Sequence, residues 1–405
     1  MNSGFDLERL NRVVDLCERY VDEGKLPCAQ VQVALEGDVV LRHTTGMADI
    51  ESNKPLGDDS IFRIYSMTKP ITSIALMQLY EQGEFLLEDP VEKFLPSFKN
   101  PVVLLGGSLF KPETRPARTV MTVRDLLTHT SGLTYGFHFQ NNLDQMYRDK
   151  KLGGPLTGKQ GRANVSLEEG IDLLGGLPLL FDPGTAWNYS MSTDVCGRLI
   201  EVIGGCGLDE YLKENIFDRL DMSDTGFFIP EDKIDRFTST YILGEDRSLQ
   251  IIDPAEDSPY QKERLFLSGG GGLISTTDDY QKFVNMLLNM GSFEEDQIIG
   301  RRTLELMTMN HLPQGKLLNE VGRSTFSETA LAGMGFGLGF SVLMDPAANA
   351  GLGTIGEFAW GGAASTRFWV DPVEKISCIF MTQFMPSSYY PIRRELTTSV
   401  YQALK

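Results

Sequence analysis

The sequence predicts an α+β fold in which strands from both ends of the chain form one antiparallel sheet, flanked by helices, around an inserted and mostly helical region. Two observations predict it. β-rich runs occur near the N-terminus and through the last third, whereas helical periodicity dominates the middle. The chain has 405 residues, enough for two lobes. We therefore expect a sheet domain from residues 1–85 and 265–405, a mostly helical domain from 86–264, and a functional site in the cleft between them.

The chain begins with a predicted helix and a predicted hairpin. Apolar residues recur at three- and four-residue intervals over 6–23, which is typical of a helix with one buried face. Two β-rich runs follow, 30–35 and 39–45, and Glu36-Gly37-Asp38 between them is a turn signal. These runs are expected to be neighbouring antiparallel strands.

A second helix is predicted to begin at Ser66. It is apolar on nearly every side, so we expect it to be buried between layers and to stop at Gly83. Pro70 fits only in the opening turn of a helix, which places Ser66 at the N-terminus. Lys69 lies three residues later and therefore on the same face.

The middle of the chain is predicted to alternate loops with short helices. Several glycines and prolines predict a loop over 100–118. Capping patterns predict helices that begin at Thr122 and at Ser166, and another helix is expected after Ser190. The span 134–165 is predicted to be long and mostly irregular, as functional lids often are.

The last third alternates glycine-rich turns with strands. The glycine run 269–272 is interpreted as a turn, and Thr276 caps the helix that follows it. Further strands are expected at 337–343, 366–370 and 376–381, and a final helix from about Ile392.

The composition limits the possible partners. The net charge of −18 repels nucleic acid and anionic membranes and favours a neutral or cationic small molecule. The chain has no apolar run of membrane-spanning length and no secretory signal pattern at its N-terminus, so a cytoplasmic protein is expected. Its five cysteines are scattered, which favours reduced thiols, and its four histidines show no metal-ligand spacing. Neither a metal nor another cofactor is expected.

Ser66 and Lys69 together suggest chemistry. A serine at a helix N-terminus, beside an ammonium group and free N–H groups, has what a nucleophile needs to form an oxyanion and hold it. The Ser-x-x-Lys pair is common, however, and a capping Ser66 beside a salt-bridged, structural Lys69 explains it equally well. Because a buried lysine is costly unless it is paired, the position on a buried helix strengthens the functional interpretation.

Two further motifs extend the pattern. A turn over 183–190 presents Tyr189 before a helix, and Gly361-Gly362 follows Trp360 on a strand edge. With the Ser-x-x-Lys pair, and in this order, they resemble the serine β-lactamase and penicillin-binding protein superfamily, whose S-x-x-K signature accompanies a Tyr or Ser motif and a K-T-G strand. The resemblance implies that superfamily's β-lactamase/transpeptidase-like fold. Segments that resemble landmarks of its class C branch are 126–133, 220–227 and 269–276.

Two positions depart from that branch. Tyr189-Ser190-Met191 stands where class C enzymes have Tyr-x-Asn, and Trp360-Gly361-Gly362 stands where they have Lys-Thr-Gly. An indole in place of the ammonium removes an attraction for acidic substrates and supplies an apolar wall. The Trp-Gly-Gly variant resembles the family VIII carboxylesterases. The resemblance therefore implies hydrolysis of short-chain, uncharged carboxylic esters.

The resemblance also implies roles for individual residues. Ser66 would carry a covalent acyl group, Lys69 and Tyr189 would act as general base and acid, and the N–H groups of Ser66 and Ala363 would form the oxyanion hole. For the aromatic residues near position 137, packing in a small satellite core is an equally good interpretation. Residues expected to contact the substrate are Trp360, Gly361, Gly362, Tyr135, Phe137 and Phe139.

Other functions remain open at this point. A β-lactamase, a D-peptide peptidase or an acyltransferase would use the same three residues, and a catalytically silent binding protein would keep the fold alone. An α/β-hydrolase is excluded, because Gly107-Ser108-Leu109-Phe110 lacks the second glycine of a nucleophile elbow and no histidine follows His311.

Overall fold

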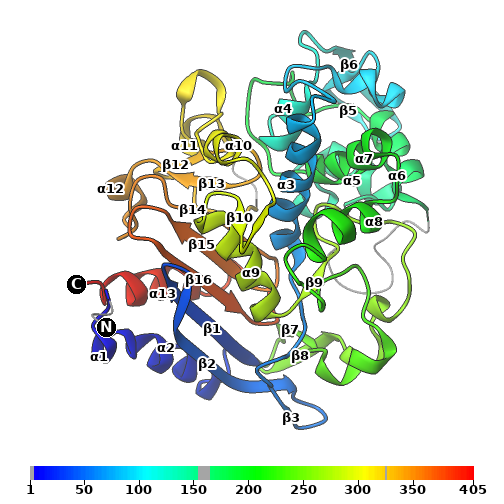
Figure 1. Cartoon of the computed structure of the whole chain (residues 1–405). Helices are drawn as coiled ribbons and strands as arrows, with labels where there is room; N and C mark the ends of the chain where they lie inside the picture. The colour runs from blue at the N-terminus through cyan, green and yellow to red at the C-terminus, as the bar shows by residue number, and fades with distance from the viewer. Residues whose placement is uncertain (1–3, 154–164, 324–325) are drawn as a thin grey trace.

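The computed structural model describes residues 4–153, 165–323 and 326–405. Within these residues, eight strands form one antiparallel sheet, which confirms the predicted α+β class (Figure 1). In spatial order the strands are β12 (Met334–Phe336), β13 (Ser341–Leu343), β14 (Phe358–Gly361), β15 (Arg367–Asp371), β16 (Ile376–Met381), β1 (Cys28–Leu35), β2 (Asp38–Asp49) and β3 (Lys54–Pro55).

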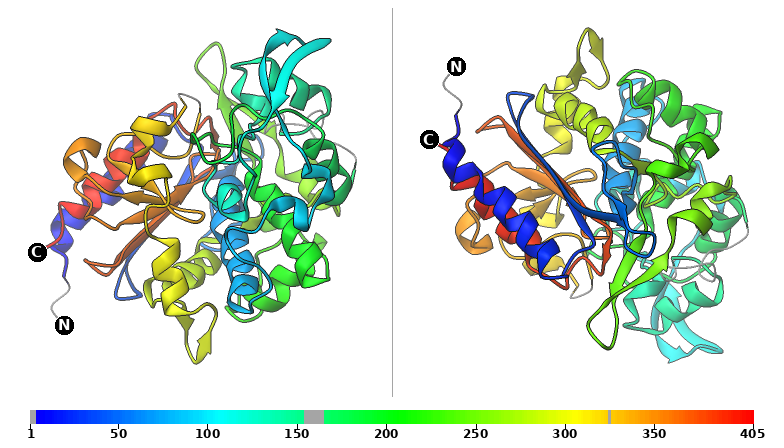
Figure 2. Two further views of the ribbon diagram at one scale, coloured as in Figure 1. Left: turned by 90° about the horizontal axis from the view of Figure 1, so that it is seen from above. Right: turned by 90° about the horizontal axis from the view of Figure 1, so that it is seen from below.

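The sheet joins the two ends of the chain. β1 pairs with β16, so that Gln30 lies opposite Met381 and Leu35 opposite Ile376. On one face, α2 (Arg12–Asp22) and α13 (Ile392–Tyr401) lie side by side (Figure 2). The helix α9 (Thr277–Leu288) packs on β1, β15 and β16. β1 is buried over nearly its whole length, as expected for a strand covered on both faces.

The helix predicted to begin at Ser66 is α3 (Thr68–Glu81), which starts two residues later and packs against α7 (Ser192–Gly204). Residues 68–79 are all buried, which confirms a helix without a solvent face. The remaining α-helices in the described residues are α1 (Leu7–Leu10), α4 (Val123–Leu127), α5 (Asn142–Asp149), α6 (Leu167–Gly175), α8 (Leu208–Leu212), α10 (Arg301–Met307), α11 (Leu318–Val321) and α12 (Pro346–Asn349).

Three predicted segments differ from the structure. The loop predicted over 100–118 is a hairpin of β5 (Val102–Ser108) and β6 (Lys111–Pro116), whose mostly exposed side chains leave no apolar alternation to detect. The strand predicted over 337–343 is a turn followed by β13, because Gly339 has a φ of +97°. The irregular span 134–165 contains α5, and its residues 154–164 lie outside the described residues.

Smaller sheets connect the two parts of the chain. β17 (Phe384–Met385) pairs in parallel with β7 (Thr240–Leu243), which pairs in turn with β8 (Leu249–Asp253). The middle of the chain therefore carries strand pairs as well as helices, and its division at residues 85 and 265 stays a prediction. Two further strand pairs are β4 (Phe62–Arg63) with β9 (Ile274–Ser275) and β10 (Ser292–Phe293) with β11 (Asp296–Gln297).

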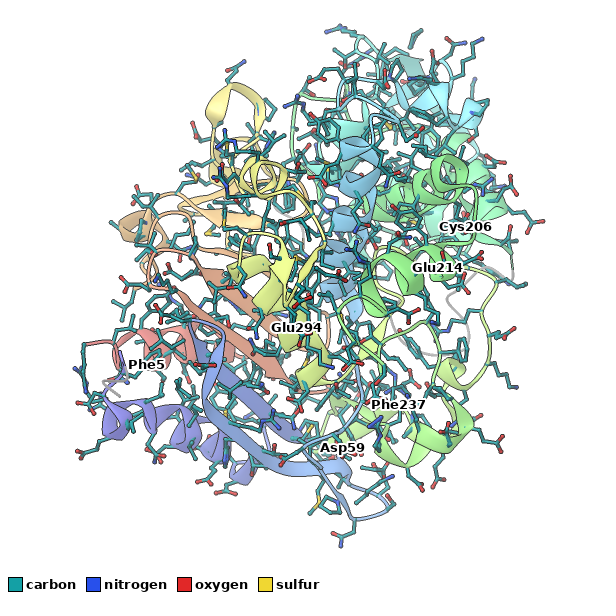
Figure 3. All side chains as sticks on the ribbon, in the orientation of Figure 1. Phe5, Asp59, Cys206, Glu214, Phe237 and Glu294 are labelled. Atoms are coloured by element: carbon teal, nitrogen blue, oxygen red, sulfur yellow. The ribbon has the colours of Figure 1, made fainter. Side chains whose placement is uncertain are left out.

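The cysteines are dispersed over both parts. Figure 3 places Cys206 near Glu214 on the α7–α8 side of the molecule. Phe5, which is labelled in the same figure, marks the opposite side, beside the terminal helices. All five cysteines are free thiols, and burial raises the pKa of Cys17 and of Cys28 to about 12. In the part of the chain that the structure describes, each helix is too short or too polar to cross a membrane.

Candidate active site

Ser66 lies in a single 3₁₀ turn, Tyr65–Met67, that leads directly into α3. Tyr65 has a φ of +43°, a left-handed conformation that is costly for a bulky side chain. Its ring belongs to a small buried cluster that includes Ala363 and Met385. Ser66 itself is 7% exposed, so its hydroxyl group lies at the edge of the core.

The structure brings together the hydroxyl group of Ser66, the amine of Lys69 and the phenol of Tyr189. The Tyr189 hydroxyl group donates a hydrogen bond to Ser66 Oγ at 2.6 Å, and Lys69 Nζ lies 3.3 Å from the same oxygen. Lys69 Nζ also lies 4.6 Å from the centroid of the Tyr189 ring. A residue from the turn before α7 thus meets two residues at the start of α3.

The glycine run 269–272 provides a hydrogen-bond acceptor for Lys69 that the sequence did not indicate. The Gly270 carbonyl accepts a hydrogen bond from Lys69 Nζ at 2.5 Å. The Gly270 N–H donates to Asp194 Oδ1 at 3.1 Å, and the Ser268 hydroxyl group donates to the same oxygen at 2.5 Å. A Cβ at position 270 would lie 2.6 Å from Asp194 Oδ2, so this approach requires glycine. The one available signal was that a buried lysine needs an acceptor.

The pKa values of the two titratable partners of Ser66, Lys69 and Tyr189, are shifted in opposite directions. Burial lowers the pKa of Lys69 to about 8, although the carboxylates of Asp194 and Glu328 act to raise it. Burial raises the pKa of Tyr189 well above its usual value, and the negative charge of Glu328 raises it further. At neutral pH the phenol is therefore protonated, while part of the lysine population is neutral.

His129 packs beside these residues. Its ring lies 5.1 Å from the Tyr189 ring in an edge-to-face arrangement, and its Nδ1 lies 3.1 Å from Ser190 Oγ. Burial lowers its pKa well below the usual value, so the ring is neutral. A neutral ring packed edge-on against Tyr189 makes His129 a packing residue here rather than a base.

Trp360 on β14 forms an apolar wall beside Tyr189. The indole is buried, and its ring centroid lies 5.5 Å from that of Tyr189 and 5.3 Å from that of Phe336. Both contacts are edge-to-face, the geometry that aromatic rings prefer. The tryptophan thus fixes the orientation of the phenol.

The two glycines after Trp360 make room for other parts of the protein. A Cβ on Gly361 would lie 2.7 Å from Cζ of Arg393, and a Cβ on Gly362 would lie 2.4 Å from the Ile64 carbonyl oxygen. Gly362 therefore lets this segment approach the turn that carries Ser66. Within the described residues, the Ala363 N–H makes no main-chain hydrogen bond.

The predicted aromatic cluster is only partly assembled at the site. Tyr135 and Phe137 are stacked with centroids 4.4 Å apart, and the Tyr135 ring lies 5.2 Å from Tyr189. Phe139 is 64% exposed instead, and the Arg148 guanidinium lies over its ring at 4.1 Å. The structure therefore brings Tyr135 to the reactive residues, with Phe137 stacked on Tyr135, and places Phe139 against an arginine at the surface.

This fold and this arrangement of residues define a class of protein, the serine hydrolases with a β-lactamase fold. The chain belongs to the β-lactamase family, because the family model described as Beta-lactamase matches residues 13–402. Esterase EstB of Burkholderia gladioli is 28% identical over 411 residues, which cover 98% of this chain and 94% of that protein.

Two further similar proteins have names that mention acyl transfer. The protein named acyltransferase calJ, from Penicillium decumbens, is 32% identical over 348 residues, which cover 82% of this chain and 78% of calJ. The solved structure of EstCE1, described as a hydrolase with promiscuous acyltransferase activity, is 25% identical with a TM-score of 0.78. It covers 97% of this chain and 99% of its own.

Proposed function

We propose that this protein is a serine carboxylesterase that hydrolyses short-chain, uncharged carboxylic esters through an acyl-enzyme on Ser66. One observation carries the proposal: Ser66 Oγ lies 2.6 Å from the Tyr189 hydroxyl group and 3.3 Å from Lys69 Nζ. A nucleophile held between a potential base and a potential acid is the arrangement that acyl transfer needs. Similarity to an esterase over nearly the whole chain supports this function.

Lys69 is the general base in this proposal. Its pKa of about 8 provides a neutral amine near neutral pH, which accepts the proton of Ser66 as Oγ attacks the ester carbonyl. Tyr189 keeps its proton because its pKa is raised, so it acts as a donor. We infer that the Tyr189 hydroxyl group gives its proton to the departing alkoxide and regains one from Lys69. A water molecule then releases the acid from Ser66.

The N–H groups of Ser66 and Ala363 form the proposed oxyanion hole, and each such donor typically lowers the barrier by roughly 3 to 4 kcal/mol. The surroundings favour an uncharged substrate. Trp360 is an apolar neighbour where a lysine would attract a carboxylate, and the buried acids Asp194 and Glu328 add negative charge nearby. We place this site between the proposed sheet domain (1–85 and 265–405) and helical domain (86–264).

Transfer of the acyl group to an alcohol is the second candidate. It uses the same acyl-enzyme and differs only in whether water or an alcohol attacks it. Similarity to a protein named as an acyltransferase supports it, as does similarity to a hydrolase with promiscuous acyltransferase activity.

Rates on two chromogenic substrates test the reaction class. We expect p-nitrophenyl butyrate to be cleaved far faster than a chromogenic cephalosporin, and the reverse order would make the protein a β-lactamase. Adding 1-butanol to the ester assay measures transfer: formation of butyl butyrate in excess of butyric acid would favour the acyltransferase.

An alkyl phosphonate tests the nucleophile independently of the substrate. Mass spectrometry is expected to find one adduct on the peptide that contains Ser66, and none in the Ser66→Ala variant. An unmodified Ser66 peptide, together with an inactive wild-type protein, would instead indicate a binding protein that has kept the fold.

A further inference from the structure

Arg393 lies on α13, far from Ser66 in sequence and outside the predicted set of site residues. Its Nη2 donates hydrogen bonds to two main-chain carbonyl oxygens, those of Gly362 and Thr366, each at 2.6 Å. The Gly362 carbonyl belongs to the same peptide unit as the Ala363 N–H. Arg393 therefore holds one end of the peptide group whose other end is the proposed oxyanion donor.

The guanidinium group is fixed by its own partners. Arg393 Nη1 lies 2.7 Å from Glu328 Oε2, and the side chains are 12% and 0% exposed. The Ser387 hydroxyl group donates to the same carboxylate oxygen at 3.0 Å. A Cβ on Gly361 would meet the guanidinium carbon at 2.7 Å, so the glycine leaves the space that Arg393 occupies. Charge pairing, burial and the glycine together fix Arg393 against this peptide unit.

We propose that Arg393 is a positioning residue of the oxyanion hole, one that orients and polarises the peptide unit between Gly362 and Ala363. A charged donor on the carbonyl draws electron density towards the oxygen, which makes the N–H at the other end a stronger donor. Since the charge on a substrate oxygen grows only as the tetrahedral intermediate forms, the effect is larger in the transition state than in the bound ester. This inference rests on the proposed function, because it requires Ala363 to bind the oxyanion.

A role confined to packing would have different consequences. If Arg393 only fastened α13 to the sheet, its loss would lower the free energy of unfolding and slow all substrates equally. An oxyanion role predicts instead that the loss of rate depends on whether oxygen or sulfur carries the negative charge of the intermediate. An ester and its thiono analogue, with C=S in place of C=O, separate the two roles, because sulfur accepts hydrogen bonds weakly.

The variants are Arg393→Gln and Arg393→Lys, with Arg394→Gln as the matched control. Arg394 is the next residue on α13, is exposed and donates to the Ala350 carbonyl at 3.0 Å, away from the glycine pair. Each variant is assayed with p-nitrophenyl butyrate and with its thiono analogue, and circular dichroism reports its fold.

We expect Arg393→Gln to lower kcat on the oxoester by roughly 10- to 100-fold, with KM changed less than about twofold. The oxoester-to-thionoester rate ratio should fall by a similar factor. Arg393→Lys, which keeps the charge but loses the planar fork, should show a smaller fall in both quantities. Arg394→Gln should match the wild type throughout.

Two results would overturn the inference: an unchanged kcat in folded Arg393→Gln, or an equal loss on both substrates. If the glutamine variant is unfolded, the rate ratio of Arg393→Lys decides in the same way. Failure of the proposed function is distinguishable, because the wild-type protein itself would then neither cleave the oxoester nor form a phosphonate adduct on Ser66.

Discussion

Two regions provide the proposed oxyanion donors, and they are built in different ways. The first, at the start of α3, is local: Ser66 and Lys69 are three residues apart, and helix geometry places them on one face. The second, after β14, is held by distant parts of the chain, with the Gly362 segment against Ile64 on one side and Arg393 on the other. The nucleophile therefore depends on spacing, whereas the second donor depends on tertiary packing.

This difference affects tolerance to change. A local pair survives as long as its helix forms, and residues 68–79 are entirely buried. The segment after β14 depends on close main-chain approach, so a single methyl group is enough to displace it. We therefore expect substitutions at the start of α3 to act through the group that is removed, and substitutions after β14 to act by displacing the main chain.

The largest effect is expected from Lys69→Met, which removes the proposed base and keeps the apolar stem. We expect kcat/KM on p-nitrophenyl butyrate to fall by about 10⁴-fold, because Ser66 loses its proton acceptor. Lys213→Met is the control, since Lys213 is exposed and, among the residues that the structure describes, forms its ion pair with Asp218. If Lys69→Met kept a rate within tenfold of the wild type, Lys69 would not be the proton acceptor.

The same difference explains what the sequence could predict. The Ser66–Lys69 pair follows from spacing and from the position of Pro70, and Tyr189 was found through its motif. Gly270 and Asp194 were missed because their contacts with the site arise only when the glycine run packs beside α3. Nothing in the local sequence around either residue indicates that contact.

Glycines illustrate the limit most clearly. Gly361-Gly362 indicated that something approaches the main chain closely, and a ligand was expected. In the structure, Arg393 and the Ile64 carbonyl fill the space that side chains at these two positions would need. Contact of the two glycines with a substrate stays a prediction. In the fold, the longer buried strands β1, β15 and β16 were predicted well, but the largely exposed hairpin β5–β6 was taken for a loop because main-chain pairing leaves no side-chain pattern.

A smaller effect is expected from Tyr189→Phe, about 10³-fold in kcat, because only the hydroxyl group is lost and the ring contacts with Trp360 and His129 remain. Tyr211→Phe is the matched control. The Tyr211 hydroxyl group is buried without a hydrogen-bond partner among the described residues, so its removal should leave the rate unchanged. Equal rates for both variants would show that Tyr189 only packs.

Gly362→Ala tests the second region directly and is expected to lower kcat by about 100-fold. The new methyl group would overlap the Ile64 carbonyl oxygen, and the Ala363 N–H would move with the displaced main chain. Gly106→Ala, on the exposed hairpin, introduces a methyl group with no atom within 4 Å and serves as the control. Steady-state kinetics of both variants decide the point, and a fully active Gly362→Ala would show that Ala363 is not needed.

The pH dependence of kcat/KM tests the Ser66–Lys69 pair at the start of α3. Lys69 acts as a base only when neutral, and its pKa is about 8. Below that pH the amine becomes protonated, so kcat/KM should fall tenfold for each unit of decreasing pH, and above it the rate should level off. A profile measured from pH 5.5 to 9.5, with p-nitrophenol release corrected for its own ionisation, provides the test. A plateau extending down to pH 6 would contradict the assignment of Lys69 as the base.

The smallest effect on turnover is expected from Thr72→Val. This variant distinguishes residues on one face of α3 that contribute to stability from those that take part in the reaction. Thr72 lies one turn after Lys69, and its hydroxyl group donates to the Gly269 carbonyl at 2.8 Å, next to the carbonyl that Lys69 binds. Valine leaves that buried acceptor unpaired, which should lower the free energy of unfolding by about 1 to 3 kcal/mol in urea titrations. Because Lys69 keeps its own contacts, kcat should stay within about threefold, and Thr72→Ser should restore stability. A large loss of kcat at unchanged stability would instead place Thr72 among the residues that set the position of the lysine.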